Sequence, residues 1–116
     1  MITCLIRYTV HPDKISDFEQ YARTWMDLIE KYGGTHHGYF VPHDSPPAAT
    51  FSFSVGEEGA SNIAVALFSF PTIEAYEKYR AEVASDPKCD AETRHRDEAQ
   101  FFTKYERTFL RPIRRD

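Results

Sequence analysis

The sequence predicts an α+β fold in which helices cover one face of a single antiparallel sheet. Several short segments alternate apolar and polar residues, which is typical of strands, whereas two longer segments repeat apolar residues every three or four positions, which is typical of amphipathic helices. The chain has 116 residues, of which 41% are hydrophobic and 28% are charged. This length and composition fit a globular protein, so we expect residues 1–116 to form a single domain.

The first strand and the first helix have the clearest patterns. Residues 2–10 alternate in hydropathy, and Pro12 ends the strand because proline cannot donate a hydrogen bond to a sheet ladder. From residue 15 to residue 32 the apolar side chains recur at spacings of three and four, which predicts an amphipathic helix. The pair Gly33-Gly34 follows at once and supplies the left-handed residue with which helices commonly end.

A second strand and a long loop come next. Residues 35–42 alternate, so His37 and Tyr39 should share one face of the strand while His36 points to the other. Residues 43–62 contain several prolines and glycines and are expected to form a long loop, with a short extra strand or hairpin arm inside it. The side chains that suggest this arm are Phe51, Phe53 and Val55.

The second half of the chain predicts a third strand and two more helices. Residues 63–70 are apolar on both faces until Ser69, which indicates a strand that is covered on both sides. Thr72 is a suitable N-cap for a second helix. Asp86 and Pro87 suit the N-cap and the first position of a third helix.

The third helix and the last strand differ in character. Residues 88–100 are almost wholly polar, so we expect that helix to be exposed. Residues 101–113 predict the last strand, with aromatic residues on one face. These aromatic residues are Phe101, Tyr105 and Phe109.

This order of elements, strand-helix-strand-strand-helix-strand, predicts a ferredoxin-like βαββαβ sheet. Right-handed crossovers place both long helices on the same face, which leaves Leu5, half of the 63–70 strand and one face of the last strand bare. A contiguous apolar surface marks an interface, so we expect a homodimer whose sheets pack face to face as a dimeric α/β barrel. The alternative is a monomer in which residues 43–62 fold over the sheet.

Composition limits the other partners and the location. The net charge of −4 argues against a general nucleic-acid binder, and no apolar run approaches the roughly 20 residues of a membrane span. The N-terminus lacks the pattern of a signal peptide. Cys4 and Cys89 lie far apart in the sequence and are expected to be reduced thiols in a cytoplasmic protein. The basic end with Arg111, Arg114 and Arg115 is interpreted as a solvated tail rather than an anion site.

The sequence contains no specific catalytic, metal or cofactor motif. His36 and His37 are adjacent on a predicted strand and would point to opposite faces, so they cannot bind one ion together. His11, His43 and His95 show no ligand spacing, and no metal site is expected. The patterns G-x-S-x-G and G-x-G-x-x-G are absent from the sequence, and no cofactor is expected.

Several short motifs occur in order along most of the chain: Arg7-Tyr8-Thr9-Val10-His11-Pro12-Asp13-Lys14 with Phe18, Gly33-Gly34, Gly38-Tyr39-Phe40-Val41-Pro42, Ala66-Leu67-Phe68-Ser69-Phe70-Pro71, Tyr76-Glu77-Lys78-Tyr79-Arg80, Asp86-Pro87 and Glu106-Arg107-Thr108-Phe109-Leu110-Arg111-Pro112. This ordered set resembles the NIPSNAP family. The resemblance implies a ferredoxin-like fold and a homodimer but no particular reaction, and relatives of this fold include small monooxygenases and haem-handling proteins. Two features depart from the family pattern: Asp13 stands where glycine is usual, and the loop after Pro42 is longer than is typical.

These residues support three functional hypotheses. The first is a NIPSNAP-like homodimer of unresolved function that binds a small apolar or aromatic ligand. The second is a cofactor-free monooxygenase or isomerase that uses His37 or His43 as acid or base and Arg7 to hold the substrate. The third is a protein-interaction module that acts through its basic C-terminal end. For Arg7 and Arg107, the alternative to ligand binding is an interface salt bridge, for instance with Glu106 or Asp116 of either chain. The candidate ligand-binding residues are Arg7, Tyr8, Tyr39 and Arg107.

Overall fold

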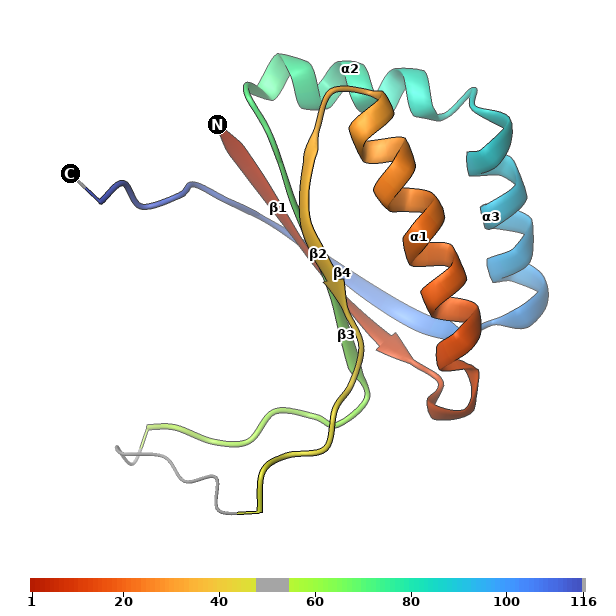
Figure 1. The fold of residues 1–116 in the computed structure, drawn as a ribbon, viewed down its shortest axis with the longest axis vertical. Coiled ribbons are helices and arrows are strands. Elements are labelled where there is room, and N and C mark those ends of the chain that lie inside the picture. Colours follow the sequence, from red (N-terminus) through yellow and green to blue (C-terminus); the bar gives the residue numbers. More distant parts are fainter. Residues whose placement is uncertain (48–54, 116) are drawn as a thin grey trace.

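The computed structural model describes residues 1–47 and 55–115 and contains four strands and three α-helices in this part of the chain (Figure 1). A single 3₁₀ turn, Pro12–Lys14, leads from the first strand into the first helix. The elements in chain order are β1 (Ile2–Val10), α1 (Ile15–Lys31), β2 (Thr35–Phe40), β3 (Ile63–Phe70), α2 (Ile73–Val83), α3 (Pro87–Ala99) and β4 (Phe102–Leu110).

The four strands form one antiparallel sheet in the order β2-β3-β1-β4. This is the ferredoxin-like arrangement, in which the first and third strands lie at the centre and the second and fourth at the edges. All three helices lie on the same side of the sheet, as Figure 1 shows. The predicted fold class is therefore confirmed, and the sheet has a helix-covered inner face and an uncovered outer face.

The helix ends follow the sequence signals. At the end of α1 the Gly33 amide donates to the Glu30 carbonyl at 3.2 Å and the Gly34 amide to the Ile29 carbonyl at 2.8 Å, and Gly33 adopts a φ of 95°. This pair of bonds is the Schellman motif, which a residue without a Cβ adopts readily. The Thr72 side chain caps α2 by accepting a hydrogen bond from the amide of Ala75 at 3.0 Å.

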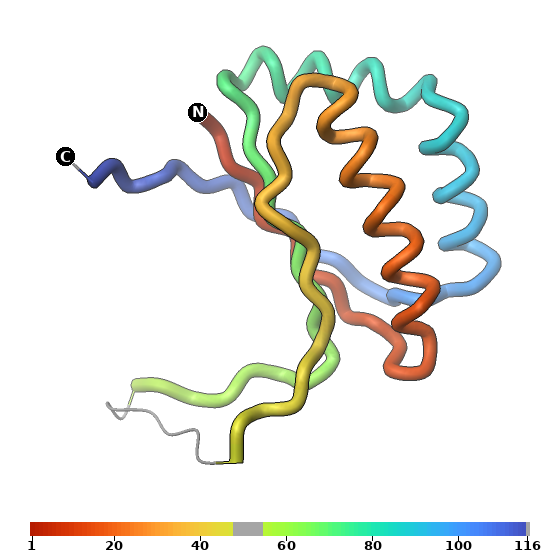
Figure 2. Tube along the Cα trace, viewed as in Figure 1, coloured from red at the N-terminus to blue at the C-terminus, as the bar shows by residue number. Residues whose placement is uncertain are grey.

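Helix α3 is not the exposed helix that its polar sequence suggested. It begins as predicted, with the Asp86 carboxylate accepting a hydrogen bond from the Lys88 amide at 2.9 Å. It then packs beside α1, as Figure 2 shows, and buries Glu92 while His95 is half-buried. The helix–helix contact is polar, and for this reason hydropathy alone did not indicate it.

Strand β2 contains a β-bulge that reverses one predicted orientation. The register against β3 shifts between His36 and Gly38, so His37 is the extra residue. His37 consequently lies on the outer face, where its Nε2 is 2.7 Å from Ser69 Oγ, while Tyr39 lies on the inner face against Phe18. The prediction that His37 and Tyr39 share a face is wrong, because strict alternation does not survive an inserted residue.

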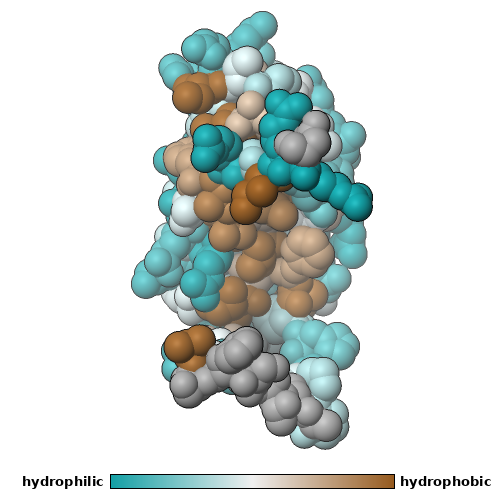
Figure 3. All heavy atoms as spheres, turned by 90° about the vertical axis from the view of Figure 1, so that its left-hand side faces the viewer, coloured by the Kyte–Doolittle hydropathy of each residue, from teal (hydrophilic) through white to brown (hydrophobic). Residues whose placement is uncertain are grey.

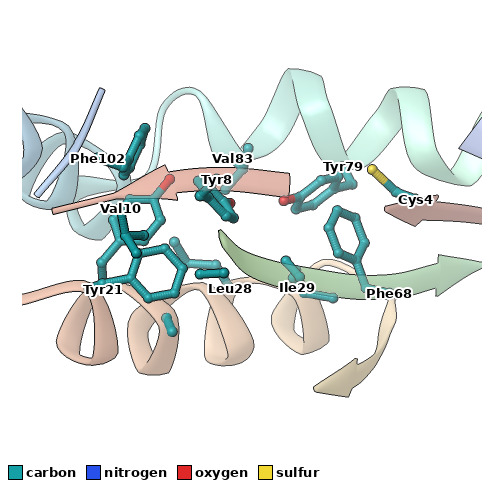
Figure 4. Packing of buried hydrophobic residues seen from close by; sticks show 14 of the residues in the cluster. Cys4, Tyr8, Val10, Tyr21, Leu28, Ile29, Phe68, Tyr79, Val83 and Phe102 are labelled. Carbon is teal, nitrogen blue, oxygen red and sulfur yellow. The ribbon is translucent and has the colours of Figure 1, made fainter. Parts of the chain in front are cut away.

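An aromatic core fills the space between the inner face and the helices. The Tyr8 ring packs edge-on against Phe18 at 5.0 Å and against Phe102 at 4.9 Å between ring centroids. Figure 4 shows Tyr8 and Phe102 in this core, with the Tyr79 ring pointing toward Tyr8. Phe101, which was predicted to begin the last strand, lies just before β4 and is fully buried in this core.

The outer face of the sheet is apolar and uncovered. Figure 3 shows hydrophobic side chains gathered along the middle of this face. The register places Leu5, Val65 and Leu67 there on the central strands, with Phe40 and Leu110 on the edge strands. Phe40 is 53% exposed and Leu110 is 42% exposed.

Two segments of the chain extend outward on the side of this outer face (Figure 1). One is the loop between β2 and β3, which has no strand in residues 41–47 and 55–62. Val55 lies in a turn, and Phe51 and Phe53 of the predicted extra strand lie outside the described residues. The other is the basic C-terminal segment, which leaves the sheet after Leu110 rather than after Ile113 as predicted.

Candidate functional site

A cavity of about 160 Å³ lies between the inner face of the sheet and the helices. Buried residues such as Tyr8, Phe68 and Tyr79 form its floor. Three exposed side chains, Arg80, Tyr105 and Arg107, lie at its rim, which we call the cavity mouth. The full lining is Ile6, Tyr8, Tyr21, Trp25, Tyr39, Phe68, Tyr76, Tyr79, Arg80, Cys89, Thr93, Arg96, Tyr105 and Arg107.

Six of the seven tyrosines of the chain line this cavity. Burial raises the pKa of Tyr8 well above its ordinary value, and the neighbouring Tyr21 and Tyr39 raise it further. Burial likewise raises the pKa of Tyr21 to about 12 and that of Tyr39 well above its ordinary value. These phenols therefore stay neutral near pH 7, and they offer aromatic faces and hydroxyl groups rather than negative charge.

The charge at the cavity mouth comes from arginines. Arg107 donates a hydrogen bond to the Tyr76 hydroxyl at 3.2 Å, and its guanidinium lies 5.1 Å from the centre of the Phe109 ring. Arg80 lies 5.8 Å from the centre of the Tyr79 ring. None of the lining residues that the structure describes is Asp, Glu or His. The cavity is therefore aromatic inside and positively charged at its mouth.

Two further side chains of the lining have useful chemistry. Trp25 is the single tryptophan of the chain, and its buried indole N–H has no hydrogen-bond acceptor among the described residues. Such a donor gains a partner when a molecule with an oxygen atom enters the cavity. Cys89 is a half-buried free thiol in the first turn of α3.

The structure brings only some of the sequence-predicted site residues together. Tyr8, Tyr39 and Arg107 all line the cavity. Arg7 does not, because it lies between Ile6 and Tyr8 and so points to the outer face. The exposed His37 also lies on the outer face, and His43 is exposed on the loop, where its Nδ1 is 2.8 Å from the Asp44 carbonyl.

Sequence reasoning missed most of the cavity. Helix α2 supplies Tyr76 and Tyr79, whose spacing of three residues puts them on one face of the helix. Helix α3 supplies Thr93 and Arg96 through the face that was expected to be exposed. The abundance of tyrosine was the available signal, since a buried phenol needs a polar partner that a purely apolar core does not provide.

The remaining histidines are structural. The His11 side chain accepts a hydrogen bond from the Asp13 amide at 3.1 Å, and His36 pairs with Glu30 at 2.9 Å. In the described parts of the chain, no group of three or more His, Cys, Asp and Glu side chains is arranged to hold a metal ion. No helix there is long and apolar enough to cross a membrane.

The fold and the site together define a ferredoxin-like α+β domain with an aromatic, arginine-rimmed cavity beneath its helices. The profile of the NIPSNAP family matches residues 3–114, which is nearly the whole chain. The chain belongs to the NIPSNAP family, as its ordered motifs predicted. A comparison with curated proteins gave no match.

Solved structures agree with this assignment. An uncharacterized NIPSNAP domain protein from Burkholderia xenovorans is 18% identical with a TM-score of 0.70, over 97% of this chain and 95% of that chain. A NIPSNAP family protein of unknown function from Agrobacterium tumefaciens is 16% identical with a TM-score of 0.72, over 100% and 91% of the two chains. SnoaB, described as a cofactor-independent oxygenase from Streptomyces nogalater, is 16% identical with a TM-score of 0.56, over 97% and 93%. At these identities the similarity shows a shared fold.

Proposed function

We propose that this protein binds a small aromatic molecule in the cavity between the sheet and the helices, and that it does so as a homodimer. The observation that carries the proposal is the concentration of six tyrosines and the single tryptophan around one space of about 160 Å³. A cavity of about 150 Å³ is large enough to hold benzene. Aromatic walls favour a planar ring through edge-to-face and offset packing.

The uncovered outer face supports the homodimer. Its apolar strip is of the kind that marks a protein interface, and the segments that extend on this side could contact a second subunit. The face also carries Arg7 and Glu106 at directly opposed positions on β1 and β4. Across a two-fold axis beside this pair, Arg7 of one copy would face Glu106 of the other, which favours a second copy as the partner.

The enzyme hypothesis receives less support. A cofactor-free monooxygenase or isomerase that used His37 or His43 would need one of them at the ligand, and both lie outside the cavity. The lining offers phenols with raised pKa values instead of a group that titrates near pH 7. Binding without an assigned reaction is therefore the function that the site supports best.

Trp25 provides the test of ligand binding. We expect a saturable change in its fluorescence when the neutral probe phenylacetamide is added. Thr93→Phe should abolish this change, because the new ring occupies the cavity that Thr93 lines. Arg94→Phe is the matched control, since it adds the same ring at the next, exposed position of α3 and should leave binding unchanged. No response in the unsubstituted protein, or a response that persists in Thr93→Phe, would contradict the proposal.

A further inference from the structure

We infer that the molecule bound in this cavity is an aromatic carboxylate, whose ring lies among the tyrosines and whose carboxylate lies at the cavity mouth between Arg107 and Arg80. This inference rests on the proposed binding function and adds the charge and the chemical class of the ligand. Its basis is an uncompensated pair of cations beside an aromatic space.

The two arginines have no counterion among the residues that the structure describes. Neither Arg107 nor Arg80 forms an ion pair with any carboxylate in the described parts of the chain, whereas Arg96, the third arginine of the lining, pairs with Asp97 at 3.1 Å. The chain as a whole has more acidic than basic residues, 18 against 14. The local excess of positive charge at this cavity therefore contrasts with the net negative charge of the chain.

Arg80 and Arg107 belong to the same cavity. Arg80, Arg107 and Tyr76 all line it, and both arginines oppose the rise that burial gives to the pKa of Tyr76. Two guanidinium groups at one cavity repel each other, and an anion placed between them relieves the repulsion. A cleft lined by one sign of charge also raises the local concentration of ligands of the opposite sign.

The geometry of the arginines favours a carboxylate. The Arg107 guanidinium contacts the Tyr76 hydroxyl and the Phe109 ring at the mouth. Only one of its N–H groups is used in the bond to Tyr76, so others remain to donate to a ligand. A guanidinium binds a carboxylate through two parallel hydrogen bonds, which gives both strength and orientation.

A matched pair of probes tests the inference. Phenylacetate and phenylacetamide have the same ring and nearly the same shape, and they differ in charge. Titration of Trp25 fluorescence at pH 7 and low salt should show phenylacetate binding at least about tenfold more tightly. Arg107→Gln should weaken phenylacetate binding, and Arg107→Gln combined with Arg80→Gln should reduce it to the level of phenylacetamide, while Arg107→Lys retains part of the preference. Arg94→Gln, which removes an exposed charge from α3, is the control and should change neither affinity.

The outcomes separate this inference from the proposed function. Equal binding of the two probes would overturn the anionic ligand and leave aromatic binding in place. A preference for phenylacetate that survives Arg107→Gln and Arg80→Gln together would also overturn it, because the charge would then be bound elsewhere. If neither probe binds to a protein whose thermal unfolding is normal, the proposed function itself fails.

Discussion

Asp86 joins the end of α1 to the beginning of α3. Its carboxylate accepts hydrogen bonds from the Lys31 ammonium at 2.8 Å, the Tyr32 hydroxyl at 2.6 Å and the Lys88 amide at 2.9 Å. The bonds from Lys31 and Tyr32 are the main reason why the pKa of Asp86 is lowered from 3.8 to about 2. One side chain therefore serves as a helix cap and as the link between two helices.

The lowered pKa of Asp86 predicts a specific acid sensitivity. Because the folded-state pKa lies below the unfolded-state value, the contribution to stability is complete above pH 3.8 and is lost as the pH falls toward about 2. Asp86→Asn keeps a capping oxygen but removes the charge, so it should lower Tm by several degrees at pH 7 and by less at pH 2. Thermal unfolding followed by circular dichroism over this range is the measurement. Asp90→Asn is the control at an exposed position of the same helix, and it should change Tm only slightly at both pH 7 and pH 2.

At the scale of elements, the contact between α1 and α3 is a row of polar groups. Thr24 donates to the Glu92 carboxylate at 3.1 Å, and His95 lies 2.9 Å from Asp17 and 3.5 Å from Glu92. The His95 ring also packs against Phe101 with 4.9 Å between centroids. The hydrogen bond to Asp17 is the largest cause of the raised pKa of His95, ahead of the opposing effect of burial.

This contact predicts a loss of stability on the alkaline side. The folded-state pKa of His95 is above the ordinary 6.5, so its contribution is complete below pH 6.5 and disappears as the pH rises through the folded-state value. His95→Gln should remove this pH dependence from chemical unfolding curves. His43→Gln, which alters an exposed loop residue, should retain it. Unfolding free energies of the unsubstituted protein that stay constant across this range would show that the ion pairs with Asp17 and Glu92 contribute nothing.

The elements differ in how far the sequence could predict them. Helix α1 was predictable because hydropathy period, Gly33 and Gly34 all agree on one structure. The bulge in β2 was not predictable, since an inserted residue leaves no mark in a period-2 pattern. The glycine at position 38, which adopts a φ of 132°, was a local sign of it in the sequence. The burial of α3 was missed because polar groups that satisfy one another carry no hydrophobic signal.

The candidate site was predictable in the same uneven way. Tyr8 and Arg107 could be placed on the inner face from strand alternation alone, and the register confirms that they lie on that face. The contributions of Trp25 and Arg96 depend on how the helices cross the sheet. That crossing is a property of tertiary packing, which no single segment of sequence encodes.

At the scale of the whole molecule, the uncovered outer face predicts the oligomeric state. We expect sedimentation at micromolar concentration to give twice the mass of one chain. Leu67→Asp places a charge at the centre of the apolar strip and should give the single-chain mass. Ile73→Asp makes the same chemical change at an apolar side chain that is 57% exposed on α2, on the helix side, and should leave the dimer intact. A stable single-chain species of the unsubstituted protein that does not bind a hydrophobic dye would contradict the dimer.

The buried phenols also determine how the cavity responds to acidity. Since the pKa of each of Tyr8, Tyr21, Tyr39 and Tyr79 is raised, these hydroxyl groups keep their protons in a mildly acidic or a mildly alkaline medium, and the arginines keep their charge. The buried phenols therefore stay uncharged over that range. A change of ligand affinity with pH there would come from the ligand itself or from a group of the protein other than these phenols and arginines.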